Sequence, residues 1–300
     1  GIGVIHKNNS IDQQIAEIVK VKKYESGMVV DPITIRDDSS LKNLISLKEK
    51  FNISGFPVVN KNNKVVGIIT NRDVRFAQNM SQPISELMTK KNLIIAEKGI
   101  SRKKALDILH SNKIEKLIVV DKYKRCVGLI TVTDIKKSEK YPLATKDHIG
   151  RLRVAAAVGV GQDGLNRAEA IFKTGADAIV LDTAHAHSKR VIDTIRAMRK
   201  IVKNNIQVIA GNIATKEAAK LLLKEKVDAI KIGIGPGSIC TTRIIAGVGV
   251  PQFSAITEIY EATKKSKIPL IADGGIRYSG DVAKAIGAGA DCVMVGSLLA

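Results

Sequence analysis

The sequence predicts an α/β protein, and two observations carry this prediction. After about residue 150, short apolar runs alternate with helical stretches, and between residues 28 and 138 a segment with paired strands occurs twice. The apolar runs are hydrophobic at consecutive positions, which is typical of parallel strands buried on both faces. We therefore expect parallel βα units that are interrupted by a duplicated insert.

The first elements are a short apolar strand at residues 1–6 and an amphipathic helix at 10–24, for which Ser10 is the expected N-cap. After the insert, the apolar runs predict six strands, at residues 152–158, 178–181, 207–210, 229–232, 269–272 and 292–295. The stretches between them predict helices at 166–174, 188–202, 215–225, 254–265 and 280–287.

Repeated βα units of this length fit either a barrel or a doubly wound sheet. Residues 159–164 have the G-x-G-x-x-G pattern of a dinucleotide-binding sheet. However, glycine-rich loops follow the last two strands, as in phosphate-binding barrels, and these loops favour the barrel. Seven strands are predicted where a barrel needs eight, so we expect an incomplete (β/α)8 TIM barrel whose missing strand precedes Gly1.

The insert consists of two copies with a constant offset of 61 residues. Each copy predicts a helix, a strand, a polar turn, a second strand, and then a threonine and an aspartate at a helix start; these pairs are Thr70 with Asp73 and Thr131 with Asp134. We expect a barrel segment at 1–27, a tandem module at 28–138 and a second barrel segment at 139–300. A hydroxyl, a carboxylate and a helix N-terminus together suit a purine nucleotide, whereas the alternative is a tethered module without a ligand.

Composition narrows the class of protein. The net charge is +19, but the lysines are scattered and aromatic residues make up only 3%, so we do not expect nucleic acid as a partner. No uninterrupted apolar run approaches the roughly 20 residues of a membrane span, so no membrane association is expected. Three cysteines without a disulfide pattern indicate a reducing, cytoplasmic compartment.

Polar and glycine residues are concentrated where the predicted strands end, which is the functional face of a barrel. The run at 233–243 brings Cys240 into a glycine-dense loop, whereas Cys126 and Cys292 lie in apolar runs and are expected to be small core residues. Loops at 273–275 and 296–297, together with Ser238, suit a phosphate monoester. His185 and His187 are two residues apart and make a poor chelating pair.

The residues at 233–243, 247–252, 272–277 and 294–300 resemble the IMP dehydrogenase family, and the duplicated segment resembles the paired cystathionine-β-synthase-type (CBS) modules of that family. The resemblance implies oxidation of IMP to XMP with NAD, in GMP biosynthesis, through a covalent thioimidate on a cysteine. It also implies a bound K+, a purine nucleotide effector at the CBS pair and a homotetramer.

The resemblance further implies roles for individual residues. Cys240 and Thr242 would be catalytic residues. IMP would be bound by Ser238, Asp273, Gly275, Gly296 and Ser297. NAD would be bound by Asp182, Thr183, Ala184, Asn212 and Gly233. The K+ ligands would be Gly235, Gly237 and Cys240. Thr70, Asp73, Thr131 and Asp134 would bind the regulatory nucleotide. One departure from the family pattern is Ala186, which stands where glycine is usual.

Two alternatives remain at this point: a GMP reductase-like enzyme, which resembles this barrel but usually lacks the insert, and a non-catalytic protein that senses purine nucleotides. The flap that carries the water-activating arginine in the family has no counterpart in this chain. We therefore expect residues 1–300 alone to be inactive in steady-state turnover.

Overall fold

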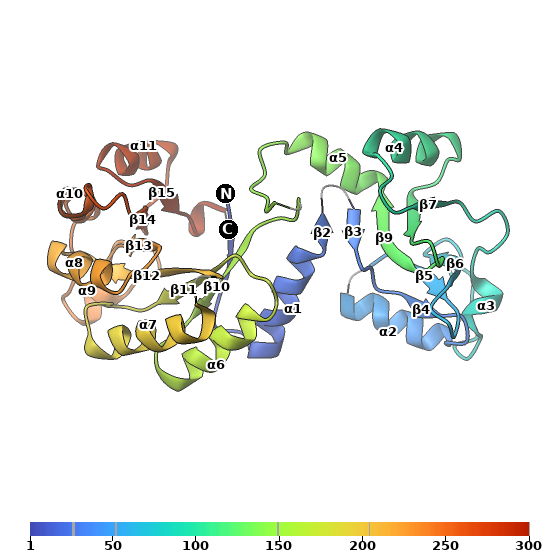
Figure 1. Cartoon of the computed structure of the whole chain (residues 1–300), viewed down its shortest axis with the longest axis horizontal. Coiled ribbons are helices and arrows are strands. Elements are labelled where there is room, and N and C mark those ends of the chain that lie inside the picture. Colours follow the sequence, from blue (N-terminus) through green and yellow to red (C-terminus); the bar gives the residue numbers. More distant parts are fainter. Residues whose placement is uncertain (26–27, 52, 149, 204, 300) are drawn as a thin grey trace. The chain divides into compact units, whose positions relative to one another are not determined.

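The computed structural model describes residues 1–25, 28–51, 53–148, 150–203 and 205–299. The chain forms two compact units, Val21–Leu152 and Ile2–Lys20 with Arg153–Ala300 (Figure 1). None of the helices in the described residues combines the length and the apolar character that crossing a membrane requires. The predicted domain boundaries at residues 28 and 138 stay a prediction; by compactness, the chain divides at residues 21 and 152.

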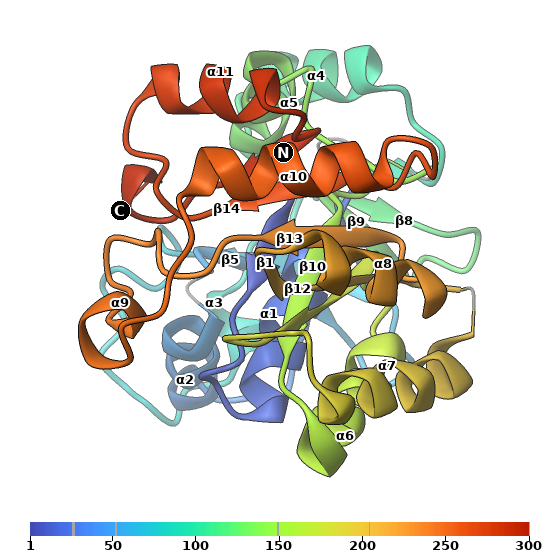
Figure 2. The same cartoon turned by 90° about the vertical axis from the view of Figure 1, so that its left-hand side faces the viewer.

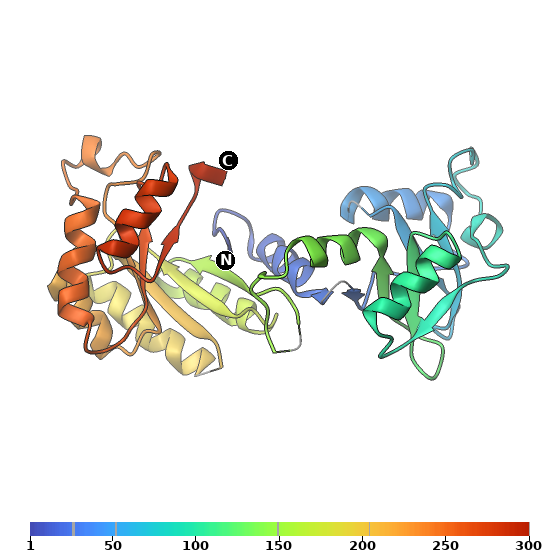
Figure 3. The same cartoon turned by 90° about the horizontal axis from the view of Figure 1, so that it is seen from above.

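The larger unit contains a seven-stranded sheet in which every strand pairs in parallel with its neighbour. Its order is β1 (Gly3–Ile5), β10 (Val154–Val158), β11 (Ala178–Asp182), β12 (Gln207–Ile213), β13 (Ala229–Ile232), β14 (Leu270–Asp273) and β15 (Cys292–Met294). The sheet curls, and its helices lie along the outer face (Figures 2 and 3). The α/β class and the seven predicted parallel strands are therefore confirmed.

The helices of this unit are α1 (Ile11–Lys22), α6 (Gly161–Phe172), α7 (Lys189–Val202), α8 (Lys216–Lys224), the short α9 (Thr242–Ile245), α10 (Gln252–Thr263), α11 (Ser279–Gly287) and η1 (Ser297–Leu299). Ser10 caps α1 as predicted, because its hydroxyl accepts from the amide of Gln13 while Gln13 Oε1 accepts from the amide of Ser10. Helix α6 begins five residues before its predicted start, because Gly164 lies inside the helix rather than in a turn. A Cβ at Gly164 would lie 2.0 Å from the carbonyl oxygen of Gly159, so close packing requires this glycine.

Burial follows the predicted pattern in the central strands and departs from it at one edge. All five residues of β10 and all four of β13 are buried, as expected of parallel strands covered on both faces. In β15, which is an edge strand, Cys292 is exposed. The expectation that Cys292 is a core residue was wrong, because β14 pairs with only one side of this strand.

The smaller unit contains two sheets. One has the order β2 (Tyr24–Glu25), β3 (Met28–Val30), β9 (Cys126–Thr131), β8 (Lys116–Val120), β7 (Ile95–Glu97), and the other has β4 (Ile35–Arg36), β5 (Gly55–Val59), β6 (Val65–Thr70). Its helices are α2 (Leu41–Phe51), α3 (Ile84–Leu87), α4 (Arg102–Ser111) and α5 (Val132–Lys140). The hairpins β5–β6 and β8–β9 are the two repeat copies, and both shift register at equivalent positions, Val58/Val59 and Val119/Val120.

The copies differ after their second strand. Helix α5 follows β9 as predicted, but residues 71–76 after β6 form successive turns with three-residue hydrogen bonds such as Asp73 N to Thr70 O. The prediction of a helix at this position was wrong. Thr89, on a segment that pairs with Ile68, donates to Asp73 at 2.8 Å and so holds the aspartate in the turn.

Candidate active site

The carboxyl ends of β11 to β15 lie next to one another along the curled sheet, because these strands are parallel and adjacent. Asp182 ends β11, Asn212 lies near the end of β12, and Asp273 ends β14. The loop after β13 carries Cys240 and is called the cysteine loop, residues 233–250. The sequence therefore places its candidate residues along one edge of the sheet.

Lys231 binds two of these carboxylates. It projects from β13, its side chain is only 3% exposed, and Nζ donates to Asp182 Oδ1 at 2.8 Å and to Asp273 Oδ2 at 2.6 Å. A buried ammonium group is stable only when carboxylates or other acceptors surround it. Lys231 thus fixes the carboxylate predicted for NAD relative to the one predicted for IMP.

Lys7, from the loop after β1, adds a second cation at Asp182. Its Nζ donates to the backbone oxygen of Asp182 at 2.6 Å and to Oδ2 at 3.3 Å. Burial opposes ionisation of Asp182, but the charges and hydrogen bonds of Lys231 and Lys7 outweigh it and lower the pKa of this carboxyl. Asp182 is therefore a carboxylate at neutral pH.

Asn212 joins the same network from β12. Its Nδ2 donates to Gly233 O at 2.7 Å and to Asp273 Oδ2 at 2.9 Å, whereas its Oδ1 is buried and accepts no hydrogen bond from the described residues. The second oxygen of Asp273, Oδ1, also has no partner among the described residues. A buried acceptor without a partner is costly unless a ligand supplies a donor, so Asn212 Oδ1 is suited to a hydroxyl or amide donor. Asp273, whose side chain is 22% exposed, offers Oδ1 to a donor that reaches it from solvent.

The cysteine loop brings the predicted nucleophile and its threonine together. The Cys240 thiol donates to Thr242 Oγ1 at 3.2 Å, and Cys240 N donates to Gly237 O in a tight turn. Hydrogen bonds from the Thr242 hydroxyl and amide, and then from the Gly235 amide, favour the thiolate and lower the pKa of Cys240. By contrast, burial raises the pKa of Cys126 to about 11, as expected of an inert thiol.

The predicted phosphate residues come from three loops, after β13, β14 and β15. Ser238 Oγ donates to Ser297 Oγ at 3.2 Å, which joins the cysteine loop to the loop after β15. The loop after β14 touches the cysteine loop, since a Cβ at Gly274 would lie 3.0 Å from the amide nitrogen of Gly237. Two hydroxyls beside glycine backbone are a suitable site for a phosphate.

The other residues predicted for NAD and phosphate binding make fewer contacts with this network. Thr183 donates through Oγ1 to Gly211 O at 2.8 Å, next to Asn212, whereas Ala184 is exposed beyond the end of β11. Gly296 accepts the amide of Leu299 in the 3-10 turn. The rings of His185 and His187 are 6.1 Å apart, and no group of three or more His, Cys, Asp or Glu side chains in the described residues could hold a metal ion.

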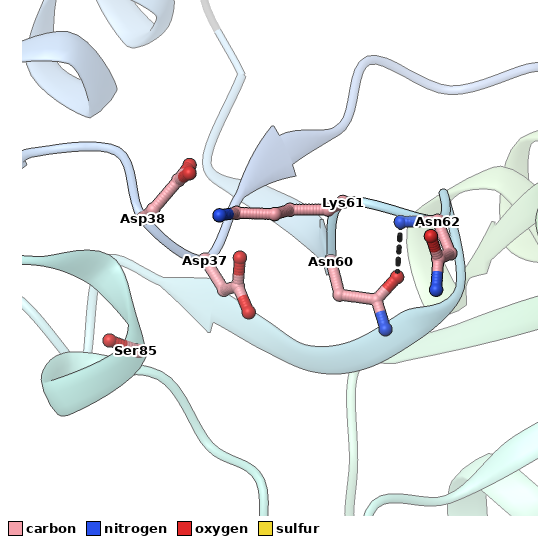
Figure 4. A pocket seen from close by; sticks show the side chains of 6 residues that line it. All are labelled: Asp37, Asp38, Asn60, Lys61, Asn62 and Ser85. Carbon is pink, nitrogen blue, oxygen red and sulfur yellow. Dashed lines mark hydrogen bonds between the residues drawn. The ribbon is translucent and has the colours of Figure 1, made fainter.

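In the module, both threonine and aspartate pairs form where the second strand of each copy ends, at Thr70 of β6 and Thr131 of β9. Thr70 Oγ1 donates to Asp73 Oδ2 at 2.7 Å, and Thr131 Oγ1 donates to Asp134 Oδ2 at 2.7 Å. A shallow pocket of this unit lies elsewhere, between the loops after β4 and β5 and helix α3 (Figure 4). It is lined by Asp37, Asp38, Asn60, Lys61, Asn62 and Ser85, and none of the residues predicted to bind nucleotide takes part.

Lys231 and Lys7 were missed by the sequence reasoning. A signal for Lys231 was present, because it is the one charged residue in the apolar strand Ala229–Ile232, and a lysine buried on both faces needs anionic partners. Lys7 gave no comparable signal, since it follows the strand end in a polar loop.

Comparison with known proteins gives a consistent result. The sequence model of the IMP dehydrogenase / GMP reductase domain matches residues 1–300. The chain is 53% identical to the inosine-5′-monophosphate dehydrogenase of Aquifex aeolicus, over 100% of this chain and 61% of that protein, and 52% identical to that of Rhizobium tropici, over 100% and 60%. It thus spans about 60% of the length of these curated relatives.

Among solved structures, GMP reductase from Trypanosoma brucei in complex with guanosine 5′-monophosphate is similar at a TM-score of 0.86 and 36% identity, covering 100% of this chain and 64% of that one. The same enzyme with guanosine 5′-triphosphate gives a TM-score of 0.87 and 37% identity, covering 100% and 73%. These matches cover the whole chain, residues 28–138 included, so the insert does not distinguish this chain from these GMP reductases.

Proposed function

The chain belongs to the IMP dehydrogenase / GMP reductase family, and from this we propose that it carries the nucleophile and the substrate-binding residues of an NAD-dependent IMP dehydrogenase. The observation that carries the proposal is the Cys240–Thr242 pair on the loop after β13, beside the carboxylates of Asp182 and Asp273. The overall reaction would convert IMP, NAD+ and water to XMP, NADH and a proton, in the synthesis of guanine nucleotides.

In this proposal the Cys240 thiolate adds to carbon 2 of the hypoxanthine ring, which is electrophilic but carries hydride, a poor leaving group. Bound NAD supplies the acceptor for that hydride. Loss of hydride leaves a thioimidate on Cys240, and addition of water then releases XMP and returns the thiol. Thr242, within 3.2 Å of the sulfur, orients the thiolate and stabilises it as it forms.

The same edge of the sheet offers suitable groups for the rest of IMP. Ser238 and Ser297, with backbone of Gly275 and Gly296, are proposed to hold the 5′-phosphate, and the 3.2 Å spacing of the two hydroxyls supports this. Asp273 is proposed to accept the ribose hydroxyls through Oδ1, because Lys231 and Asn212 already occupy Oδ2.

For NAD we propose Asp182, with Thr183, Ala184, Asn212 and Gly233 around it. Asp182 is 39% exposed, so a ligand can reach it, and its lowered pKa keeps it ionised. K+ is proposed to bind the main-chain oxygens of Gly235, Gly237 and Cys240. Among the described residues, Gly237 O accepts only the Cys240 amide, and a carbonyl oxygen has a second lone pair, so this set fits a cation.

The proposal is tested with Cys240→Ala in the full-length protein. We expect NADH formation from IMP and NAD to fall by about 10³-fold or more, with IMP affinity nearly unchanged, because phosphate and ribose contacts lie elsewhere. Cys292→Ala is the matched control, since Cys292 is also accessible but lies at the edge strand. Full activity in Cys240→Ala, or loss only in Cys292→Ala, would contradict the thioimidate.

A GMP reductase activity is the second candidate, because the similar Trypanosoma brucei structures are GMP reductases. The higher identity to the IMP dehydrogenases, 53% against 36–37%, supports the oxidative reaction. Assays of NADPH consumption with GMP and of NADH formation with IMP, on one preparation, decide between the two.

For the module we propose binding of a purine nucleotide at the two threonine and aspartate pairs, as a CBS pair would bind it, within a homotetramer. The supporting observation is that both copies keep the hydroxyl and carboxylate in contact. Calorimetry with ATP and GTP on the whole protein, compared with Thr131→Val, tests binding, and light scattering tests the tetramer. A non-catalytic sensor would bind nucleotide here yet show no turnover.

We also propose that the protein is located in the reducing cytoplasm, and the three free cysteines support this proposal.

A further inference from the structure

Gln14 is a polar residue of α1 that is fully buried beside the carboxyl ends of two strands. Its exposure is 0%, and its Nε2 donates to Ile5 O at 3.0 Å, His6 O at 3.1 Å and Ala157 O at 2.9 Å. Ile5 ends β1 and Ala157 lies near the end of β10, and these two strands pair in parallel. A buried amide needs partners for its polar atoms, and here those partners tie α1 to the ends of both strands.

Arg167 completes this network from α6. It is only 8% exposed, and its Nη1 donates to Gln14 Oε1 at 3.0 Å and to Asn9 O at 3.0 Å. The guanidinium therefore fixes the amide of Gln14 and the main chain at Asn9 together. The two side chains hold the carbonyl groups of His6 and Asn9, which lie on either side of Lys7. The loop after β1 is thus bound at both ends of the short stretch that carries this lysine.

Lys7 reaches from this loop to Asp182, which ends β11. Lys7 Nζ donates to Asp182 Oδ2, and Lys231 Nζ donates to Oδ1, so each carboxylate oxygen accepts from a different lysine. In the sheet order β1, β10, β11, β12, β13, the two lysines approach β11 from opposite directions, each from two strands away. Cations on opposite sides restrict the rotation of a carboxylate more than one cation does. The orientation of Asp182 therefore depends on Lys7 as well as on Lys231.

We propose that Lys7 is a positioning residue for NAD, because it fixes the orientation of Asp182, the carboxylate proposed to bind the dinucleotide. Gln14 and Arg167 support this role by holding the loop that carries Lys7. A binding group is effective when hydrogen bonds from behind it lock its orientation before the ligand arrives. The inference rests on the proposed function, since it presumes that Asp182 binds NAD.

The test measures NAD binding by titration calorimetry in the full-length protein, in a Cys240→Ala background saturated with IMP, so that no turnover occurs. We expect Lys7→Met to raise the Kd of NAD about three- to tenfold and to leave the Kd of IMP within about twofold, because only Asp182 loses a charged donor. Lys7→Arg keeps the charge with a different donor geometry and should recover part of the affinity. The Lys7 side chain is 36% exposed, so thermal unfolding should change little in Lys7→Met.

Gln14→Leu tests whether the buried pair acts through Lys7. Leucine removes the amide but keeps an apolar side chain of similar size. If the amide acts by holding Lys7, Gln14→Leu raises the Kd of NAD about threefold on its own and by less than about 1.5-fold when Lys7→Met is already present. Gln13→Leu, at an exposed position of the same helix, is the matched control and should leave the Kd of NAD unchanged. If Gln14→Leu does not fold, the Lys7 variants still decide the proposal.

An unchanged Kd of NAD in Lys7→Met would overturn the assignment, and so would equal losses of NAD and IMP affinity. A loss that Lys7→Arg does not recover at all would also overturn it, because the lysine charge would then play no part. Additive losses from Gln14→Leu and Lys7→Met would overturn the part played by the buried pair. Failure of the proposed function appears separately, as full activity in Cys240→Ala.

Discussion

Lys22 and Lys231 are both buried lysines that bind aspartates far away in the sequence, but their partners differ. Lys22 Nζ donates to Asp147 Oδ2 at 3.1 Å, and Asp147 also accepts from the Arg151 amide through Oδ1 and from Arg151 Nε through Oδ2. Asp147 is only 7% exposed. The partners of Lys231 are 39% and 22% exposed, and Asp273 keeps one oxygen without a partner among the described residues.

This difference separates a structural ion pair from one that serves a site. In the smaller unit, Asp147 is buried and both of its oxygens accept from protein groups, so a ligand cannot reach it. At the edge of the parallel sheet, the lysine holds two carboxylates in place and leaves acceptors free. Buried lysines alone therefore say little about function, and the free acceptors of their partners say more.

The largest effect on stability is expected from Lys22→Met. Methionine keeps the apolar stem, but Asp147 loses a buried cation, and breaking such a pair costs about 3–5 kcal/mol. Urea unfolding followed by circular dichroism measures this loss. Lys20→Met, an exposed lysine of the same helix, is the matched control and should change stability by less than about 0.5 kcal/mol. Equal effects of the two changes would refute the structural role.

The same pair gives a pH dependence. Burial opposes ionisation of Asp147, but the Arg151 amide, Lys22 and the Arg151 side chain outweigh it and hold the pKa well below its usual range. A lowered folded pKa adds stability that is present above the unfolded pKa, about 4, and is lost as the pH falls further. The unfolded state contributes equally to wild type and Lys22→Met, so the stability difference should be constant near pH 7. It should shrink as the pH falls through the pKa of Asp147 in the variant, which is higher because the cation is gone, towards its low value in wild type. A difference that stays constant to pH 2 would contradict this account.

Lys231→Met is expected to cost less stability and more activity. Both carboxylates are partly in water, so the loss of the cation should destabilise by about 2 kcal/mol, below the range for fully buried pairs. Because the two carboxylates then repel and move apart, we expect kcat/KM for IMP in the full-length protein to fall about 100-fold. Lys231→Arg, which keeps the charge, should recover part of the activity. Loss of stability without loss of activity would show that Lys231, like Lys22, has only a structural role.

The sequence predicted most of the fold because its signals are local. Apolar runs gave the seven parallel strands, and the offset of 61 residues gave the two hairpins with matching register shifts. The errors occurred where a distant segment decides the structure. Thr89 holds Asp73 in a turn where a helix was expected, and the edge position of β15 exposes Cys292.

The candidate site follows the same rule. Cys240 and Thr242 are two residues apart, so their contact could be foreseen from the loop. Asp182, Lys231 and Asp273 come from three strands, and only the parallel order of those strands brings them together. Arg243 lies in the cysteine loop, but its position beside Gly235 and Gly249 depends on the loop closing at Val250, which the spacing of residues does not predict.

The smallest effect is expected where an aspartate is held by an exposed neighbour. Thr89→Val removes the hydroxyl that donates to Asp73 but keeps the shape of the side chain, and we expect a loss of about 0.5–1 kcal/mol, because Asp73 still accepts from Thr70 N and Oγ1. Thr89→Ser keeps the hydroxyl and should lie close to wild type in urea unfolding. If serine destabilised as much as valine, the methyl group rather than the hydrogen bond would matter. Asp73 would then be held by Thr70 alone, and the turn at residues 71–76 would need another cause.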